Sequence, residues 1–277
     1  MSVEMLRTAL QGAGELLLRP APLVSDSFRQ REVLRETAHR AWPLPREPWF
    51  MGQIWLDLLF AHWRVPPEAL AGAVPPHLPL DTYDGSAWIG VTPFCIAGLR
   101  LRGTTPAPGL STFAELNART YVSLGGKPGI YFLSLDAASR AAVQAARRSY
   151  RLPYFRSRIA MEENGEGIRF DATRTSDDGE PARFAARYGP DGGRLPVRPD
   201  SLERWLTERY CLYTLDERQR VLRAEIHHPP WPLQPAWGEI EANTMTAPYG
   251  IELPGEPLLH FSARQDVALW PLRPASG

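Results

Sequence analysis

The stretch STFAELNARTYVSLGGKPGIYFLSLDA, residues 111–137, predicts the centre of a β-sheet. Both of its halves are rich in residues that favour strands, and glycines and a proline interrupt the pattern between them. Pro128 and Gly129 suit the two central positions of a type II turn, with Lys127 just before them. The stretch therefore predicts a β-hairpin with Lys127 at the rim of its turn.

Similar strand-prone segments recur from Ile54 onward, separated by Gly, Pro and Asp. Examples are QIWLDLLFAHWRV, SAWIGVTPFCIAGLRLRG and LLHFSARQDVALWPL. Many short strands with turn residues between them are typical of a sandwich or a barrel. We therefore expect a mainly β fold, a curved antiparallel β-barrel with inserted helices.

Two segments interrupt the strands with helical sequences. DAASRAAVQAARRSYRLP is rich in alanine, with Asp136 as its expected N-cap and Pro153 beyond its end. In PDSLERWLTERY, Asp200 stands three residues before Glu203, as in a capping box. We expect helices near residues 136–150 and 200–210.

The beginning of the chain differs from the remainder. Residues 1–45 have helical character and end in the proline-rich AWPLPREPWF, which starts at Ala41. We expect an N-terminal helical arm with a proline-rich linker over residues 1–47 and a β-barrel domain over residues 48–277. The first segment has no long apolar run, which argues against a secretory signal or a membrane span.

Composition limits the function classes. Lys and Arg number 31 and Asp and Glu number 31, so no net charge points to nucleic acid or an acidic membrane surface as a partner. Cys95 and Cys211 are too few for a disulfide framework, which favours a reducing compartment. We expect a cytoplasmic protein.

Common cofactor and metal motifs are missing from the sequence, since GxSxG, GxGxxG, Walker and HExxH patterns do not occur. His227 and His228 are neighbours on a predicted strand and would point to opposite faces, so they could not readily share a metal. We expect neither a metal nor a cofactor.

A row of polar residues marks the strand in STFAELNARTYVS. If the segment is extended, one face carries the side chains of Glu115, Asn117, Arg119, Tyr121 and Ser123. Such a face is either the solvent side of a half-buried strand or the polar lining of a closed barrel, and periodicity does not decide between them.

Three further residues have a structural interpretation as well as a functional one. Lys127 is the only lysine and could form a Schiff base in a dry pocket, but a hairpin rim is normally wet, so we expect no such role. His62 is either a ligand contact or a structural histidine. Arg209 either reaches a pocket or ties down the helix before it.

Several ordered motifs resemble the YqjF-like bacterial proteins, a family of unknown function. The resemblance covers about residues 48–272 and includes MGQIWLDLLFAHWRVP, LPLDTYDGSAWIGVTPF, FAELNARTYV, GKPGIYFLSLDA, LPYF and LTERYCLY. It implies a fold similar to that of acetoacetate decarboxylase, a curved antiparallel barrel around a small-molecule cavity.

Acetoacetate decarboxylases carry their Schiff-base lysine in a stretch of the form Arg-x-x-Trp-x-Phe-Pro-Lys. This chain is similar there, with Arg147, Tyr150 and Pro153, but Tyr154 stands in place of the lysine. A phenol forms no imine, so Schiff-base decarboxylation is not expected. The same resemblance matches Glu115 to a barrel glutamate near that lysine.

We therefore expect a protein that binds or transforms a small carbonyl or carboxylate compound, as a lyase or hydrolase without a Schiff base. Arg119 would hold an anionic group, Glu115 would act as acid or base, and Tyr154 would donate a hydrogen bond to a carbonyl oxygen. Asn117, Tyr121, His62 and Arg209 would complete the ligand site. A homo-oligomer of this chain is compatible with these expectations. The alternative is a non-catalytic sensor or interaction module whose barrel is filled by side chains.

Overall fold

The computed structural model describes residues 32–107 and 111–275. Most of the expected N-terminal arm therefore lies outside the described residues. The part of the arm that is described, residues 32–47, carries turns and bends after Val33.

The described chain is mostly strand, as the sequence predicts. The strands are β1 (Met51–Val65), β2 (Ala87–Leu101), β3 (Phe113–Leu124), β4 (Lys127–Ala137), β5 (Tyr154–Asn164), β6 (Gly167–Arg174), β7 (Arg183–Pro190), β8 (Cys211–Leu215), β9 (Val221–His227), β10 (Gln234–Asn243), β11 (Leu258–Leu269) and β12 (Arg273–Pro274). The helices are η1 (Pro67–Leu70), α3 (Arg140–Tyr150), α4 (Leu202–Thr207) and η2 (Ala247–Tyr249).

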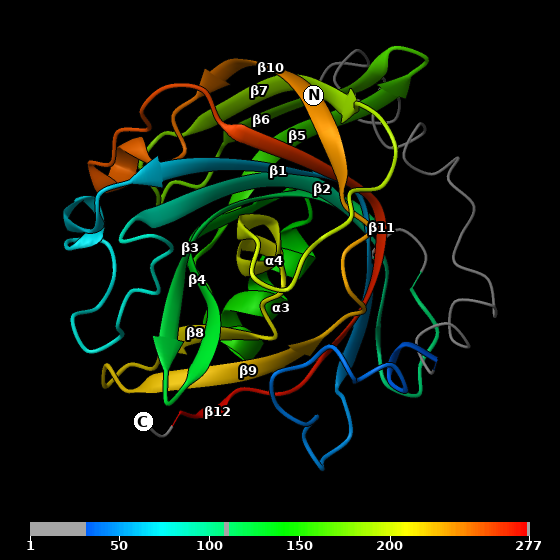
Figure 1. The fold of residues 1–277 in the computed structure, drawn as a ribbon, viewed down its shortest axis with the longest axis vertical. Coiled ribbons are helices and arrows are strands. Elements are labelled where there is room, and N and C mark those ends of the chain that lie inside the picture. Colours follow the sequence, from blue (N-terminus) through cyan, green and yellow to red (C-terminus); the bar gives the residue numbers. More distant parts are fainter. Residues whose placement is uncertain (1–31, 108–110, 276–277) are drawn as a thin grey trace.

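The strands close into two rings that share β11, β1, β2, β3 and β4 (Figure 1). The large ring continues from β4 through β5, β6, β7 and β10 back to β11. The small ring continues from β4 through β8 and β9 back to β11. The barrel prediction is confirmed, with the difference that the β4–β5 and β4–β8 pairings are parallel.

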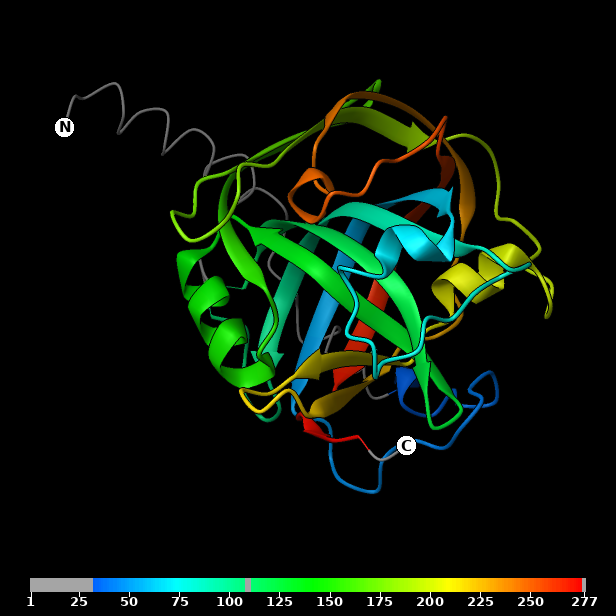
Figure 2. The ribbon, with the colours of Figure 1, turned by 90° about the vertical axis from the view of Figure 1, so that its left-hand side faces the viewer.

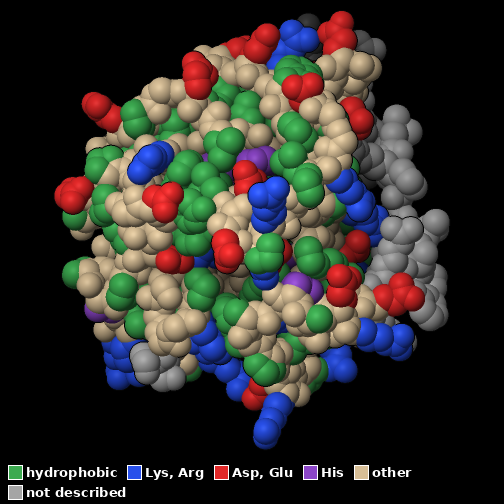
Figure 3. All heavy atoms as spheres, viewed as in Figure 1, with side chains coloured by type: hydrophobic (Ala, Val, Ile, Leu, Met, Phe, Trp, Pro, Cys, Tyr) green, Lys and Arg blue, Asp and Glu red, His purple; other side chains and the backbone are tan. Residues whose placement is uncertain are grey.

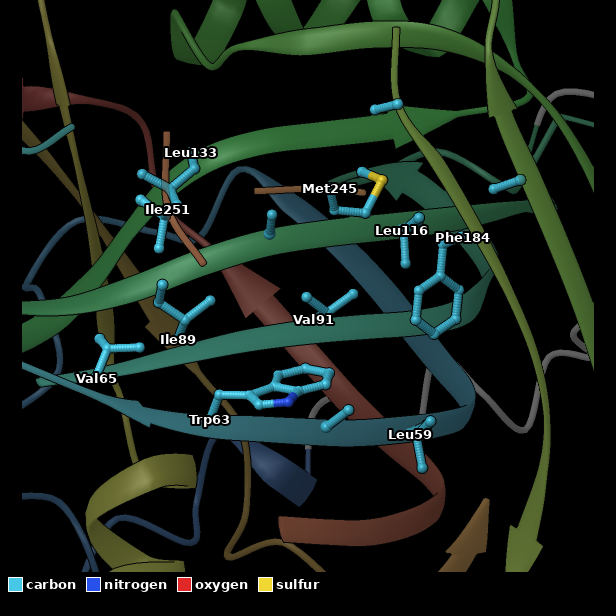
Figure 4. Close-up of a cluster of buried hydrophobic side chains, with 14 of the residues drawn as sticks. Leu59, Trp63, Val65, Ile89, Val91, Leu116, Leu133, Phe184, Met245 and Ile251 are labelled. Atoms are coloured by element: carbon cyan, nitrogen blue, oxygen red, sulfur yellow. The ribbon is translucent and has the colours of Figure 1, made fainter. Parts of the chain in front are cut away.

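The shared strands bury both of their faces over most of their length. Inside the large ring, Leu59 and Leu116 belong to a cluster with Phe184 of β7, as Figure 4 shows. Inside the small ring, Phe60 packs in a second cluster with Ile226 of β9. Because successive side chains of a strand point to opposite faces, each shared strand supplies both interiors.

Helices α3 and α4 lie at opposite ends of the small ring (Figures 1 and 2). Their N-caps are Ser139, which accepts from the Ala142 N–H at 3.2 Å, and Ser201. The expected caps Asp136 and Asp200 are therefore wrong, because a serine next to each helix start takes that role. None of the helices in the described ranges combines the length and apolar character that crossing a bilayer needs.

The β3–β4 hairpin turns at Gly125 and Gly126, not at Pro128–Gly129 as expected. Both glycines have positive φ, 59° and 70°, and Leu124 pairs with Lys127 across a two-residue loop. Positive φ at both central residues is the geometry of a type I′ turn, whose twist matches that of paired strands. Lys127 does lie at the rim of the hairpin.

A buried ion pair joins β4 to β5 and β6, where the large ring closes. The Asp136 carboxylate accepts from Arg174 Nη2 at 2.7 Å and Nε at 2.9 Å, and from Ser157 Oγ at 2.6 Å. The Arg174 guanidinium also lies 4.0 Å from the centroid of the Phe155 ring. Two parallel N–H···O bonds and a hydroxyl donor satisfy this carboxylate without water.

We predict that Asp136→Asn destabilises the protein by roughly 3–5 kcal/mol, because it leaves the Arg174 charge buried without an opposite charge. Urea unfolding monitored by tryptophan fluorescence measures the loss. The matched control is Glu166→Gln, which breaks the exposed pair of Glu166 with Arg187 and should cost under about 1 kcal/mol. Equal losses in the two variants would show that the buried pair contributes no more to the free energy of unfolding than the exposed pair does.

Candidate functional site

The polar row of β3 points into the small ring. Its members Glu115, Asn117, Arg119 and Tyr121 are all buried, with Glu115 2% and Arg119 6% exposed. Glu115 pairs with Phe94 across β2–β3, and Phe94 belongs to the cluster inside the small ring. The inward alternative is therefore confirmed, and the solvent-face alternative is wrong.

One end of the row is an acid site built by Glu115 and Tyr154. Arg151 ends α3 in a left-handed conformation, and Tyr154 then pairs with Leu135 of β4. This connection brings the Tyr154 hydroxyl to 3.0 Å from Glu115 Oε2, to which it donates. Asn117, with its amide assigned from the hydrogen-bond network, donates to Glu115 Oε1 at 3.1 Å.

Burial sets the protonation of this pair. Desolvation raises the pKa of Glu115 to about 8, although the hydrogen bonds from Tyr154 and Asn117 oppose that rise. The pKa of Tyr154 lies well above its ordinary value because of burial, with the Glu115 charge adding to the shift. At neutral pH, Glu115 is therefore a protonated acid with a proton that it can give up, and Tyr154 remains a hydrogen-bond donor.

The other end of the row surrounds Arg119. His62 of β1 forms a hydrogen bond with the Tyr121 hydroxyl through Nε2 at 2.6 Å, and the Arg119 guanidinium carbon lies 6.0 Å from the centre of the same ring. Burial holds the pKa of His62 well below its usual range, with the Arg119 charge acting in the same direction. Gly90 leaves room for both groups, since a Cβ there would lie 3.1 Å from His62 Nε2 and 3.3 Å from Arg119 Nε.

The polar groups at this end have few partners. Neutral His62 carries one N–H, and when Tyr121 donates to Nε2 that proton is on Nδ1. Neither His62 Nδ1 nor Arg119 Nε has a hydrogen-bond partner within the described ranges. Two buried N–H donors are thus left without an acceptor.

Arg119 differs from three other enclosed arginines in having no carboxylate partner among the described residues. Three others are ion-paired: Arg40 with Glu225, Arg174 with Asp136, and Arg209 with Asp81. Arg119 makes no ion pair with any described carboxylate, and the Phe60 ring lies 5.3 Å from its guanidinium carbon. A Glu115–Arg119 pair, which their spacing on one face allows, is not formed, because Glu115 bonds Tyr154 and Asn117 instead.

Arg209 holds α4 over this end of the row. Its Nε donates to the Trp205 carbonyl at 2.6 Å, and its Nη1 bonds the Asp81 carboxylate. The guanidinium also lies 4.2 Å from the Trp205 ring and 4.9 Å from the Tyr121 ring. The structure thus places Arg209 where it ties down the helix and covers Tyr121.

His260 of β11 is a residue of this site that the sequence analysis missed. It pairs with Phe60 across β1–β11, and its charge contributes to the lowered pKa of His62. Its Nδ1 has no partner among the described residues. The signal was present in LLHFSARQDV, where His260 and Ser262 alternate with apolar residues.

No group of three His, Cys, Asp or Glu residues that could hold a metal occurs in residues 32–107 and 111–275. His227 and His228 bond to different segments, the Val33 and Arg209 carbonyls.

Two hollows have volumes of about 220 and 280 Å³. Trp237 lines the first and Lys127 lines the second, and no residue of the polar row lines either one.

We predict that Glu115→Gln removes an alkaline loss of stability. A carboxyl with a folded pKa of about 8 and an unfolded pKa near 4.5 makes the folded state lose stability as pH rises through this interval. Between pH 5 and pH 9, urea melts should show wild type losing roughly 3–4 kcal/mol relative to the variant. Glu166→Gln, at an exposed site, should follow wild type, and parallel pH profiles for all three proteins would contradict a raised pKa.

Comparison with known proteins agrees with this architecture. The chain is 48% identical to the uncharacterized protein YqjF of Bacillus subtilis (strain 168) over 251 residues, which are 90% of this chain and 99% of that protein. The enduracididine biosynthesis enzyme MppR complexed with pyruvate is similar in structure, with a TM-score of 0.59 at 15% identity over 85% of this chain and 93% of the other. Acetoacetate decarboxylase from Legionella pneumophila gives a TM-score of 0.55 at 12% identity over 86% and 94%.

At such low identity the solved structures show the fold alone, and they confirm that it is similar to that of acetoacetate decarboxylase. The sequence match to the family DUF2071, described as an uncharacterized conserved protein, extends over residues 52–266. Together with the relative from Bacillus subtilis, it shows that this chain belongs to the DUF2071 family.

Proposed function

We propose that the chain binds a small organic carboxylate inside the small ring, with Arg119 as its anchor and Glu115 and Tyr154 as the proton-transfer pair. The observation that carries the proposal is the buried Arg119 guanidinium with an unpartnered Nε and no described carboxylate. An uncompensated buried charge is costly, and a bound carboxylate would compensate it. A planar carboxylate also matches the donor geometry of a guanidinium.

The acid end suits chemistry at a carbonyl group. A protonated Glu115 beside the Tyr154 hydroxyl can polarise a carbonyl oxygen, and the same carboxyl can return or accept a proton near neutral pH. The reaction class is proton transfer next to a carbonyl, without an imine. Asn117 lies between the two ends, so a ligand that reaches both needs a carbon chain longer than that of pyruvate.

The fold neighbours supply the substrate class by analogy. MppR is complexed with pyruvate, and other neighbours are acetoacetate decarboxylases, so both names contain a small keto acid. This chain shares the fold with these proteins. We extend the keto acid class to this chain because Arg119 is placed to bind a carboxylate and Glu115 to act on a carbonyl group.

A non-catalytic module with a filled barrel is the second candidate. Aromatic side chains occupy the small ring beside the row: the Trp231 ring lies 4.8 Å from Phe60 and 5.8 Å from Trp55. In that case the interior would take no ligand. The behaviour of Arg119 separates the two candidates.

We predict that Arg119→Met leaves the ligand-free protein as stable as wild type or more stable by roughly 1–3 kcal/mol, because it removes an uncompensated buried charge. Urea melts of refolded protein measure this. Arg174→Met is the matched buried control and should lose roughly 3–5 kcal/mol, since it strands Asp136. A comparable loss in both variants would mean that Arg119 is a structural residue.

Native mass spectrometry of protein purified from its own host tests the ligand itself. Wild type should retain a small acid that Arg119→Met has lost and that the exposed-site control Arg158→Met still carries. An interior without any retained molecule, combined with a destabilised Arg119→Met, would favour the filled module.

We further predict that borohydride reduction with acetoacetate or pyruvate leaves the protein mass unchanged. Tyr154 cannot form an imine, and Lys127 is 29% exposed and ion-paired with Glu225 at 3.4 Å, so it does not lie in the dry pocket that a Schiff-base lysine needs. Intact-mass spectrometry reads the outcome. An adduct mapped to Lys127 would overturn the interpretation of the hairpin rim.

A further inference from the structure

A second cluster of charges lies outside the small ring, around Glu225 of β9. Its carboxylate meets Arg40 Nη2 at 3.2 Å, Arg223 Nε at 3.1 Å and Lys127 Nζ at 3.4 Å. Trp42 Nε1 donates to it at 2.7 Å. The two oxygens of this carboxylate are contacted by four donor groups. Three of these groups are cations, which together face a single negative charge.

The cluster borders a hollow of about 280 Å³. Segments distant in sequence form its walls, among them Pro43, Pro45, Pro271 and Pro274, while Lys127 and Arg223 supply charged lining. Proline fixes φ, so these walls hold their shape without a ligand. A preformed hollow loses little entropy when a ligand enters it.

The charge balance of the lining favours an anion. The lining contains the cations Lys127, Arg223 and Arg273 against the two acids Glu47 and Glu225, and Glu47 is paired with Arg273 at 2.6 Å. The surplus in the lining is one positive charge, and Arg40, which pairs with Glu225 from outside the lining, adds a second. Figure 3 shows Lys and Arg side chains gathered along the lower edge of the molecule, where β9 and β12 lie in Figure 1.

Lys127 has unused bonding capacity toward the hollow. Its ammonium carries three N–H donors, and its polar contact within the described ranges is the long one to Glu225. The Trp42 ring, 5.3 Å from Nζ, supports it from the side. The only lysine of the chain is thus held in place beside the hollow with donors to spare.

We infer that this hollow binds a small organic anion, with a phosphate or carboxylate head on Lys127 and Arg223 and an apolar part against the proline walls. This site is separate from the row inside the small ring and does not rest on the function proposed for it. The rigid apolar walls and the surplus cations select together for an anion that carries a hydrocarbon group.

Calorimetric titration with phenyl phosphate tests the inference. Wild type should bind it saturably and at least threefold more tightly than inorganic phosphate, and benzoate as the carboxylate arm shows which head is preferred. Lys127→Met should weaken binding about tenfold or more, while Lys127→Arg should stay within about threefold of wild type. Arg158→Met, at an exposed cation on β5, should bind as wild type does.

A second readout uses the single lysine. Reductive ¹³C-methylation labels Lys127 as the one side-chain amine, so its methyl resonance should shift saturably with phenyl phosphate. If Lys127→Met fails to fold, Arg223→Met replaces it with the same expectation. Absence of saturable binding to wild type, or unchanged binding in folded Lys127→Met, would overturn the site, and equal affinity for phosphate and phenyl phosphate would overturn its apolar part.

Discussion

The shared strands bury both faces over most of their length, and this constraint governs the remaining structure. Each of β1, β2, β3, β4 and β11 has one face in the large ring and the other in the small ring. A polar side chain on β3 therefore has no route to bulk water and must find a partner in the interior. The row from Glu115 to Tyr121 is a consequence of that enclosure, and so are its perturbed protonation states.

Enclosure also distinguishes a buried charge that has a partner from one that has none. Asp136 and Arg174 satisfy each other where the large ring closes, and nothing further is needed to stabilise them. Arg119 is buried to a similar degree without such a partner. A protein that keeps an arginine in this state retains a cost in stability, which is common where a residue serves binding.

The sequence predicted the barrel and the row because strand spacing and alternation are local signals. It did not predict the turn, since GGKPG holds two competing turn signals and only strand twist favours the Gly125–Gly126 geometry. The cap of the first helix was predicted wrongly for a similar reason, because Ser139 and Asp136 are both good capping residues. Asp136 instead accepts hydrogen bonds from Arg174, which is distant in sequence, and Ser139 caps the helix. The pairing of Glu115 with Tyr154 depends on a parallel β4–β5 contact, which no local pattern announces. His260 was missed because its neighbours across β1 and α4 are remote in sequence.

The two rings close on very short seams. β9 joins β11 at two residue pairs, Ala268 with His227 and Leu269 with Ile226, whereas β1 and β11 pair from Met51 to His62. The β10–β11 and β4–β8 pairings are equally short, with two residue pairs each. Local opening begins where the fewest backbone bonds must break, so these three seams are the weak lines of the two rings. We expect amide protons there to exchange with solvent before those of β1, and the same opening would connect the enclosed interior with solvent.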